Sequence, residues 1–417
     1  MAASVTKTVI NDLLANEGPA EDDLSVVARA LNVIRSHLGM DVAYVSEFVG
    51  NESVFREVDA PGLEALIKVG DRRSLDDIYC RHILEGRLPE LIPDTGQIPL
   101  AASMPITSAV PIGSHVSIPI KLPDGRPYGM FCCLSARPDR SLGQRDLEIM
   151  RAFADFAADE IITEIETKKA FAAKRSQVVS VITGEGFSIH YQPIWNIRSG
   201  QVVGFESLSR FNLEPTSPDH WFQLASEVGM SLELELAAIK KALSGLGALE
   251  DRSVYLAINA SPDTAGNKHF RSLLDGFDLT RIVLEITEHT DPSDIEHLIE
   301  AIEPLRKSGM RLAIDDVGVG HSGLQRMLKL RPDLLKLDMS LTRNIHADPA
   351  RQALASALAR FSSVTETTII AEGVESRDEL EALNSLGIEF AQGYLLGRPK
   401  LLKDAMDDAF GREPSLR

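Results

Sequence analysis

The feature that most constrains this chain is a series of short apolar segments between residues 187 and 396, separated by helical patterns. Such alternation predicts parallel strands that are joined by helical crossovers. Eight strands of this kind within about 220 residues are typical of a closed β/α barrel. The segments are 187–197, 202–211, 254–261, 282–288, 311–317, 334–340, 368–374 and 390–396.

The first two segments depart from this pattern, because only a short turn at 198–201 separates them. A connection this short has no room for a crossover helix, so it predicts an antiparallel pair. We therefore expect an α/β fold with an irregular, TIM-like (β/α)8 barrel whose first strand is antiparallel.

Polar side chains interrupt these apolar segments near their carboxyl ends. Buried barrel strands are otherwise nearly all apolar, and their carboxyl ends face one mouth, where active sites lie. Several acids gathered there would be costly to bury unless cations neutralised them. The residues are Glu206, Asn259, Glu285, Asp315, Asp316, Lys336, Asp338, Glu372, Glu375 and Gln392.

The candidate metal ligands in this set all offer oxygen atoms. Such ligands favour hard divalent ions, Mg²⁺ or Mn²⁺, over zinc. The adjacent Asp315 and Asp316 can each face a different ion, and one of them can bridge both. Two ions held in this way form a clamp for in-line attack on a phosphodiester. A lone acid at a strand end is more simply a helix cap or a surface residue, but a set on so many strands is not.

The first half of the chain has a different pattern. A helical pattern at 23–39 precedes two strand patterns at 41–50 and 52–60, and a hairpin turns at 123–127. These elements predict an α+β domain before the barrel. A long helical pattern over 141–179 carries a narrow apolar stripe with charged residues on its other faces. It predicts a dimerising coiled-coil linker, and the alternative is a terminal helix packed on its own domain.

Composition excludes some classes of function. The 417 residues carry a formal net charge of −18, which opposes binding to DNA. A small anionic substrate is compatible with it, since bound divalent ions reverse the local sign. The chain has no run of about 18 apolar residues, so we expect no membrane span, and its first residues do not have the pattern of a secretory signal. Its 3 cysteines are too few for a disulfide framework, which predicts a cytoplasmic location.

Residues 186–400 resemble an EAL domain throughout their length. The resemblance implies a metal-dependent phosphodiesterase that uses two ions, Mg²⁺ or Mn²⁺, to hydrolyse cyclic di-GMP to linear 5′-pGpG. The matching segments are YQPIW (191–195), ESLSR (206–210), ASEVGMSLELE (225–235), INAS (258–261), LEITE (284–288), IDDVGVGHSGL (314–324), LLKLD (334–338), AEGVES (371–376) and AQGYLLGRP (391–399).

The resemblance also implies roles for individual residues. Asp315 would bridge the two ions and Asp316 would bind the second. Lys336 would hold the attacking water, and Glu372 would act as the general base. The implied metal ligands are Glu206, Asn259, Glu285, Asp315 and Asp316, the substrate contacts Gln192, Arg210 and Gln392, and the supporting residues Glu288, Asp338 and Glu375.

Some positions depart from the EAL pattern. Ser207 replaces an alanine of the name motif, and Val317, His321 and Gly323 replace the phenylalanine, tyrosine and serine of the loop after the paired aspartates. The altered loop leaves a second hypothesis open, a catalytically weak EAL-type receptor that binds cyclic di-GMP and signals to a protein partner. A purely structural barrel would leave the clustered acids unexplained.

Residues 21–165 resemble a GAF sensory domain, which implies a small-molecule ligand such as a cyclic nucleotide, haem or bilin. Cys80 and His82 can be interpreted as a chromophore or haem site, or as core and surface residues. We expect a GAF-like domain at 21–165, a helical linker at 141–180 that overlaps its exit helix, and an EAL domain at 181–406. We expect a homodimer, formed through the long helix and the barrel face near 317–346.

Overall fold

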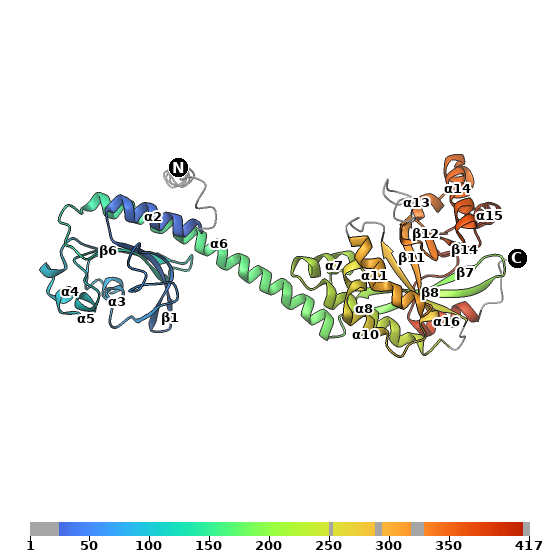
Figure 1. Cartoon of the computed structure of the whole chain (residues 1–417), viewed down its shortest axis with the longest axis horizontal. Helices are drawn as coiled ribbons and strands as arrows, with labels where there is room; N and C mark the ends of the chain where they lie inside the picture. The colour runs from blue at the N-terminus through green and yellow to red at the C-terminus, as the bar shows by residue number, and fades with distance from the viewer. Residues whose placement is uncertain (1–24, 250–252, 288–293, 318–328, 412–417) are drawn as a thin grey trace. The chain divides into compact units, whose positions relative to one another are not determined.

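The chain forms two compact units, with the division between Ala170 and Phe171 (Figure 1). Within the part of the chain that is described, no helix has the length and the apolar character needed to cross a membrane. The computed structural model describes residues 25–249, 253–287, 294–317 and 329–411.

The first unit is built on a six-stranded antiparallel sheet. Gly50, with φ of 64°, makes the tight turn between the first two strands, as its left-handed backbone allows. The strands are β1 (Val42–Val49), β2 (Glu52–Asp59), β3 (Arg72–Ser74), β4 (Leu91–Ile92), β5 (Ser114–Lys121) and β6 (Pro127–Ser135), in the spatial order β3-β2-β1-β6-β5-β4.

Each face of this sheet has its own core, because successive residues of a strand point to opposite sides. Phe131 and Cys133 face α2 (Val26–Leu38) and the first part of α6 (Gln144–Thr183). Met130 and Cys132 face the opposite core, under the segment that holds α3 (Tyr79–Leu84), α4 (Pro99–Ser103) and α5 (Pro105–Ala109). Figure 1 shows α2 and α6 on one side of the sheet and α3, α4 and α5 on the other.

The helices of this unit begin and end where local chemistry predicts. The Ser25 side chain accepts a hydrogen bond from Ala28 N at the start of α2, and Gly39, with φ of 61°, ends the helix. The predicted long helix over 141–179 corresponds to α6. In the second unit, Val178 and Val181 of this helix are buried in the core.

The second unit is a closed eight-stranded barrel. Strand β7 runs antiparallel to both of its neighbours, and the other neighbouring strands are parallel. This confirms the predicted irregular barrel. The strands are β7 (Phe187–Asn196), β8 (Gln201–Phe211), β9 (Tyr255–Asn259), β10 (Ile282–Thr287), β11 (Arg311–Val317), β12 (Leu334–Leu337), β13 (Thr368–Ala371) and β14 (Phe390–Ala391).

Helices surround the barrel and complete the main apolar core on its outer side. The turn between β7 and β8 is fixed by Asn196, whose side-chain oxygen accepts hydrogen bonds from the backbone N–H groups of Arg198 and Ser199. The helices are α7 (Pro218–Glu227), α8 (Ser231–Leu246), α9 (Pro262–Gly266), α10 (Lys268–Leu274), α11 (Asp294–Lys307), α13 (Met339–Thr342), α14 (Pro349–Thr365), α15 (Arg377–Ser385) and α16 (Leu402–Phe410).

Candidate functional site

The polar residues of the site form one layer inside the barrel. Side chains two residues apart on a strand point the same way. The apolar cluster that fills the barrel includes Ala257, Val283, Ala313, Leu334 and Ile370. Two residues further along the chain from each of these lie Asn259, Glu285, Asp315, Lys336 and Glu372. Each strand therefore places an apolar residue in the barrel and a polar residue nearer the mouth at its carboxyl end.

Lys336 lies among the acids of this layer, with only 1% of its side chain exposed. Its Nζ is 2.8 Å from Glu372 Oε1 and 3.0 Å from Glu285 Oε2. It is 3.2 Å from both Glu206 Oε1 and Asp315 Oδ1. One ammonium group thus faces four carboxylates, so the cluster has an excess of negative charge that a divalent cation could neutralise.

Burial and mutual repulsion shift the pKa values of these groups. Burial raises the pKa of Glu285 well above its ordinary range, and the charges of Glu206 and Asp315 add to that effect although Lys336 opposes it. Burial likewise raises the pKa of Glu372 to about 8. Burial would lower the pKa of Lys336, but the surrounding carboxylates raise it well above its ordinary value. Lys336 therefore remains an ammonium.

Glu206 differs from its neighbours. Burial raises its pKa, but Lys336 and the hydrogen bonds donated by Gln392 and Asn259 outweigh burial and lower the pKa overall. Asn259 Nδ2 lies 3.4 Å from Glu206 Oε1. Glu206 is consequently held as a carboxylate more firmly than Glu285 or Glu372, whose pKa values are raised.

Three of the carboxylates lie close enough to bind one cation. Oxygen atoms of Glu206, Glu285 and Asp315 are all within 4.8 Å of one another. The amide of Asn259 can present its oxygen beside them after a simple flip. A ligand set made only of oxygen fits Mg²⁺ or Mn²⁺, so the residues that are present fit the predicted type of metal.

Two predicted site residues fall outside this description. Asp316 belongs to β11, but its side chain is outside the described residues. Glu288 and the loop residues 318–323 are also outside them. The second metal position, which Asp316 was predicted to hold, therefore stays a prediction.

Two glutamines, Gln192 of β7 and Gln392 directly after β14, are hydrogen-bonded to each other beside Glu206. Gln392 Nε2 donates to Gln192 Oε1 at 2.9 Å and also to Glu206 Oε2. Gln192 Nε2 in turn donates to the backbone oxygen of Gly397 at 2.9 Å. A Cβ on Gly393 would lie 2.2 Å from backbone atoms of Val374, so only glycine lets the chain pass there. The glutamines are thereby held in fixed positions at the edge of the acidic layer.

A cavity of about 510 Å³ adjoins the acidic layer and includes Arg210, Asn259 and Glu285 in its lining. Arg210 Nη1 donates to the backbone oxygen of Ser209 at 2.8 Å. Glu235 of α8 also lines the cavity, and it accepts hydrogen bonds from Ser261 N at 2.8 Å and Ser261 Oγ at 2.9 Å. Sequence reasoning did not single out Glu235, because the helical pattern does not distinguish it from its neighbours.

Two of the predicted supporting residues have local partners. Asp338 Oδ1 accepts from Ser340 N at 2.9 Å and caps α13, which is why β12 ends earlier than the apolar segment predicted. Glu375 Oε2 accepts from Arg343 Nη2 at 3.2 Å. The structure thus joins both acids to segments that flank the barrel mouth.

Comparisons with known proteins match both units. The model of the EAL domain matches residues 175–399, and the model of the GAF domain matches residues 24–161. The probable cyclic di-GMP phosphodiesterase PdeI of Escherichia coli is 32% identical over 259 residues, which are 58% of this chain and 32% of that protein. The chain spans about a third of the length of the curated relatives that it matches first.

Solved structures give a similar picture. The PaMucR phosphodiesterase in complex with c-di-GMP is 25% identical, with a TM-score of 0.51 over 56% of this chain and 99% of that one. The EAL enzyme Bd1971, in a form bound to cAMP and cyclic di-GMP, is 19% identical with a TM-score of 0.54, and covers 89% of this chain and 93% of its own. At this identity, the second likeness concerns the fold alone.

Proposed function

Because the chain belongs to the EAL domain family, we propose that it is a metal-dependent phosphodiesterase that hydrolyses cyclic di-GMP to linear 5′-pGpG. The observation that carries the proposal is the buried layer in which Lys336 contacts Glu206, Glu285, Asp315 and Glu372. The relative PdeI is named as a probable phosphodiesterase for this substrate, and the PaMucR phosphodiesterase was solved with c-di-GMP.

The metal site is proposed to hold two ions, Mg²⁺ or Mn²⁺. Glu206, Asn259, Glu285 and Asp315 would hold the first ion, and Asp315 would share the second with Asp316. When bound, such ions polarise a phosphodiester and lower the pKa of a water molecule. The clustered oxygen atoms of the three described carboxylates support this assignment.

Lys336 and Glu372 are proposed to handle the attacking water. Glu372 accepts its proton, and a pKa of about 8 makes this carboxyl group a stronger base than an exposed glutamate. Lys336, 2.8 Å from Glu372, orients the water and stabilises charge that develops on the phosphate. The water oxygen bonds to phosphorus as its proton passes to Glu372, the bond from phosphorus to the 3′-oxygen breaks, and that oxygen takes up a proton from solvent water.

The cavity of about 510 Å³ beside this layer is proposed to bind the substrate. Arg210 lines it and offers guanidinium donors to a phosphate. Gln192 and Gln392, which lie beside Glu206 and outside the lining of this cavity, are also proposed to contact the substrate. Glu288, Asp338 and Glu375 are proposed to support the loops around the metals.

Turnover of cyclic di-GMP by the full chain tests the proposal. Purified protein is incubated with the substrate and Mg²⁺ or Mn²⁺, and the products are separated by chromatography. We expect linear pGpG, and no product when a chelator removes the metal. Binding of cyclic di-GMP without product at any metal concentration would instead support the receptor hypothesis. If the protein neither bound nor hydrolysed cyclic di-GMP, the phosphodiesterase and receptor hypotheses would both be refuted.

The first unit is proposed to regulate this enzyme as a GAF sensory domain. The domain limits follow the sequence: a sensory domain at 21–165, a linker at 141–180 and an EAL domain at 181–406. Turnover by a 176–417 fragment, compared with the full chain, measures the effect of the sensory domain. Equal rates with and without it, at every candidate ligand, would contradict regulation. The cytoplasmic location stays a prediction.

The chain is also proposed to form a homodimer through α6 and the barrel face near 317–346. Phe171 of α6 is 47% exposed, as a residue on a contact surface would be. Sedimentation at micromolar concentration should give twice the mass of 45.6 kDa. A single 45.6 kDa species would contradict the dimer without bearing on the chemistry.

A further inference from the structure

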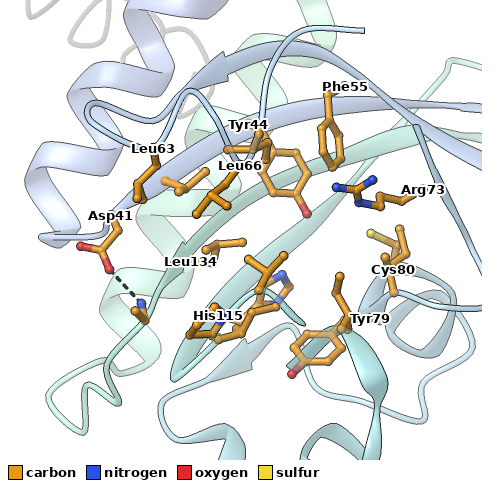
Figure 2. Close-up of a pocket in the computed structure, with 18 residues that line it drawn as sticks. Asp41, Tyr44, Phe55, Leu63, Leu66, Arg73, Tyr79, Cys80, His115 and Leu134 are labelled. Atoms are coloured by element: carbon orange, nitrogen blue, oxygen red, sulfur yellow. Dashed lines mark hydrogen bonds between the residues drawn. The ribbon is translucent and has the colours of Figure 1, made fainter. Parts of the chain in front are cut away.

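The first unit contains a cavity of about 180 Å³ on the face of its sheet opposite α2 and α6. Most of its lining is apolar, and Tyr44 of β1 and Phe55 of β2 form one wall. Figure 2 shows these two rings on one side, with Tyr79 and His115 across from them. None of these residues takes part in the chemistry proposed for the barrel, so the cavity needs its own explanation.

The size of the cavity limits what it can hold. An apolar cavity of about 150 Å³ accommodates benzene, whereas pockets for drug-sized ligands begin at about 300 Å³. At about 180 Å³, this cavity accommodates a single ring with one or two substituents. A cyclic nucleotide, which joins a purine, a ribose and a phosphate, is too large, and haem and bilins are larger still.

A cation lies at one end of this apolar space. Figure 2 shows the Arg73 guanidinium turned towards Tyr44 and Phe55. Its Nη1 donates to the backbone oxygen of Arg72 at 3.3 Å, and no carboxylate among the described residues pairs with it. A guanidinium beside an apolar cavity is suited to a bidentate bond with a carboxylate.

A buried nitrogen supplies a second, independent sign of a ligand. His115 is 2% exposed, and its Nδ1 has no hydrogen-bond partner among the described residues. Its ring packs edge-on against Tyr79, with the ring centroids 5.1 Å apart. Buried polar atoms are nearly always paired in folded proteins, so this atom calls for a partner that the cavity can supply.

Two other polar groups of the lining, on Tyr79 and Asp41, are already engaged. The Tyr79 hydroxyl is 2.5 Å from Thr107 Oγ1. Asp41 accepts hydrogen bonds from Ser135 Oγ at 2.6 Å and from Ala136 N at 2.8 Å. Figure 2 shows Asp41 at the end of the cavity away from Arg73. Asp41 is thus already hydrogen-bonded within the protein, whereas the guanidinium of Arg73 keeps donors for a ligand.

We propose that this cavity binds a small single-ring carboxylic acid, with its carboxylate on Arg73, its ring among the apolar side chains, and a second polar group at His115. A regulatory role of this acid rests on the phosphodiesterase activity proposed above, whereas binding of the acid to the cavity does not. Cys80 lines the same cavity, but His82 is not part of its lining. The two residues considered for a chromophore or haem thus do not converge on it.

Titration calorimetry of the full chain with 4-hydroxybenzoate, in the absence of cyclic di-GMP, tests the proposal. We expect saturable binding with one site, and a loss of about tenfold or more in affinity for Arg73→Gln, because a charge-assisted bond is removed. Arg72→Gln is the matched control. Arg72 is on the same strand and pairs with Glu52 at 2.7 Å, outside the cavity lining, so its variant should stay within about twofold of the parent.

Two further probes sharpen the result. The neutral 4-methylphenol should bind more weakly, with an affinity that Arg73→Gln does not change, and cyclic GMP should not bind. The proposal is overturned by absence of 4-hydroxybenzoate binding up to about 10 mM, by equal affinity in Arg73→Gln, or by tighter binding of cyclic GMP. Since no probe is a substrate, these outcomes are independent of whether the barrel hydrolyses cyclic di-GMP.

Discussion

The mouth of the barrel and the cavity of the first unit handle charge in opposite ways. In the barrel, four carboxylates crowd one buried ammonium, and their negative excess fits divalent cations. In the first unit, one arginine stands at the end of an apolar cavity with a buried histidine nitrogen that has no partner among the described residues. In the barrel, each charged group shifts the pKa values of the others, so the metal site depends on all of them together. The cavity of the first unit needs only one cation and an apolar space of the right size to bind a small acid.

The largest effect is expected where the negative charges of the barrel are removed. Glu206→Ala takes away a carboxylate that contacts Lys336, Asn259 and Gln392. Turnover should fall about a thousandfold or more, because the metal loses a ligand that supports the transition state. Manganese binding, measured by calorimetry, should weaken in parallel.

The matched control for this variant is Glu381→Ala, at an exposed position of α15. It should keep full turnover and full metal affinity. Full turnover in Glu206→Ala would show that the acidic layer does not hold the metal. The barrel site could then no longer be contrasted with the first unit as a site for cations.

The next effect concerns the charge balance of the barrel. Lys336→Met removes the ammonium and leaves the carboxylate of Glu206, whose pKa Lys336 helps to lower, buried without it. The free energy of unfolding should fall by about 3–5 kcal/mol in the presence of a chelator, since unpaired buried charges are costly. Manganese should restore more stability to this variant than to the parent.

Tryptophan fluorescence in urea measures this change selectively, because both tryptophans, Trp195 and Trp221, belong to the second unit. Lys307→Met, at a lysine that pairs with Glu303 across 3.4 Å on the surface, is the control and should change stability little. A Lys336→Met protein as stable as the parent in chelator would mean that its neighbours are already neutral.

Catalysis should respond more selectively to the proposed base. Glu372→Gln keeps the shape of the side chain beside Lys336 and removes the group that accepts a proton. We expect kcat to fall about 10²–10⁴-fold, while manganese affinity and KM stay within about threefold. Glu381→Gln serves as the control, and an unchanged kcat in Glu372→Gln would assign the base to another residue.

The two sites also differ in how far the sequence predicts them. The barrel and its site can be predicted because strands that are otherwise apolar carry an acid, an amide or a lysine near their carboxyl ends. Each such residue comes two positions after an inward-facing apolar residue, as Lys336 follows Leu334 and Glu285 follows Val283. A buried charge is costly, so its presence in such a strand predicts a function. Glu235 escaped notice because an acid on a helix has an ordinary explanation as a surface residue.

The cavity of the first unit could not be predicted in this way. Its lining comes from separate segments, and apolar residues such as Phe55 and Ile112 look the same in a sequence whether they fill a core or border a cavity. The adjacent cysteines illustrate the limit: both are buried, but Cys132 faces the cavity side of the sheet and Cys133 the helices. Only the strand register, set by tertiary packing, decides which is which.

The smallest expected effect separates the two sites within one molecule. Ligands slow backbone hydrogen exchange where they stabilise local structure. Manganese should therefore slow exchange in β9, β10 and β11, which carry the acidic layer, and 4-hydroxybenzoate should slow it in β5 and the segment around Tyr79. Each change should be about threefold to tenfold at saturation, since local opening is already limited by a strand ladder.

Exchange measured by mass spectrometry on the full chain gives both readings in one experiment. Glu206→Ala should abolish the manganese effect and preserve that of 4-hydroxybenzoate, and Arg73→Gln should do the reverse. If manganese slowed exchange in β5 as strongly as in β10, the two sites would not act as separate chemical environments. 4-Hydroxybenzoate could instead slow exchange in β10 of Glu206→Ala but not of Arg73→Gln. That result would mean that binding of the acid to the first unit changes the stability of the barrel, as a regulatory ligand of the first unit must do.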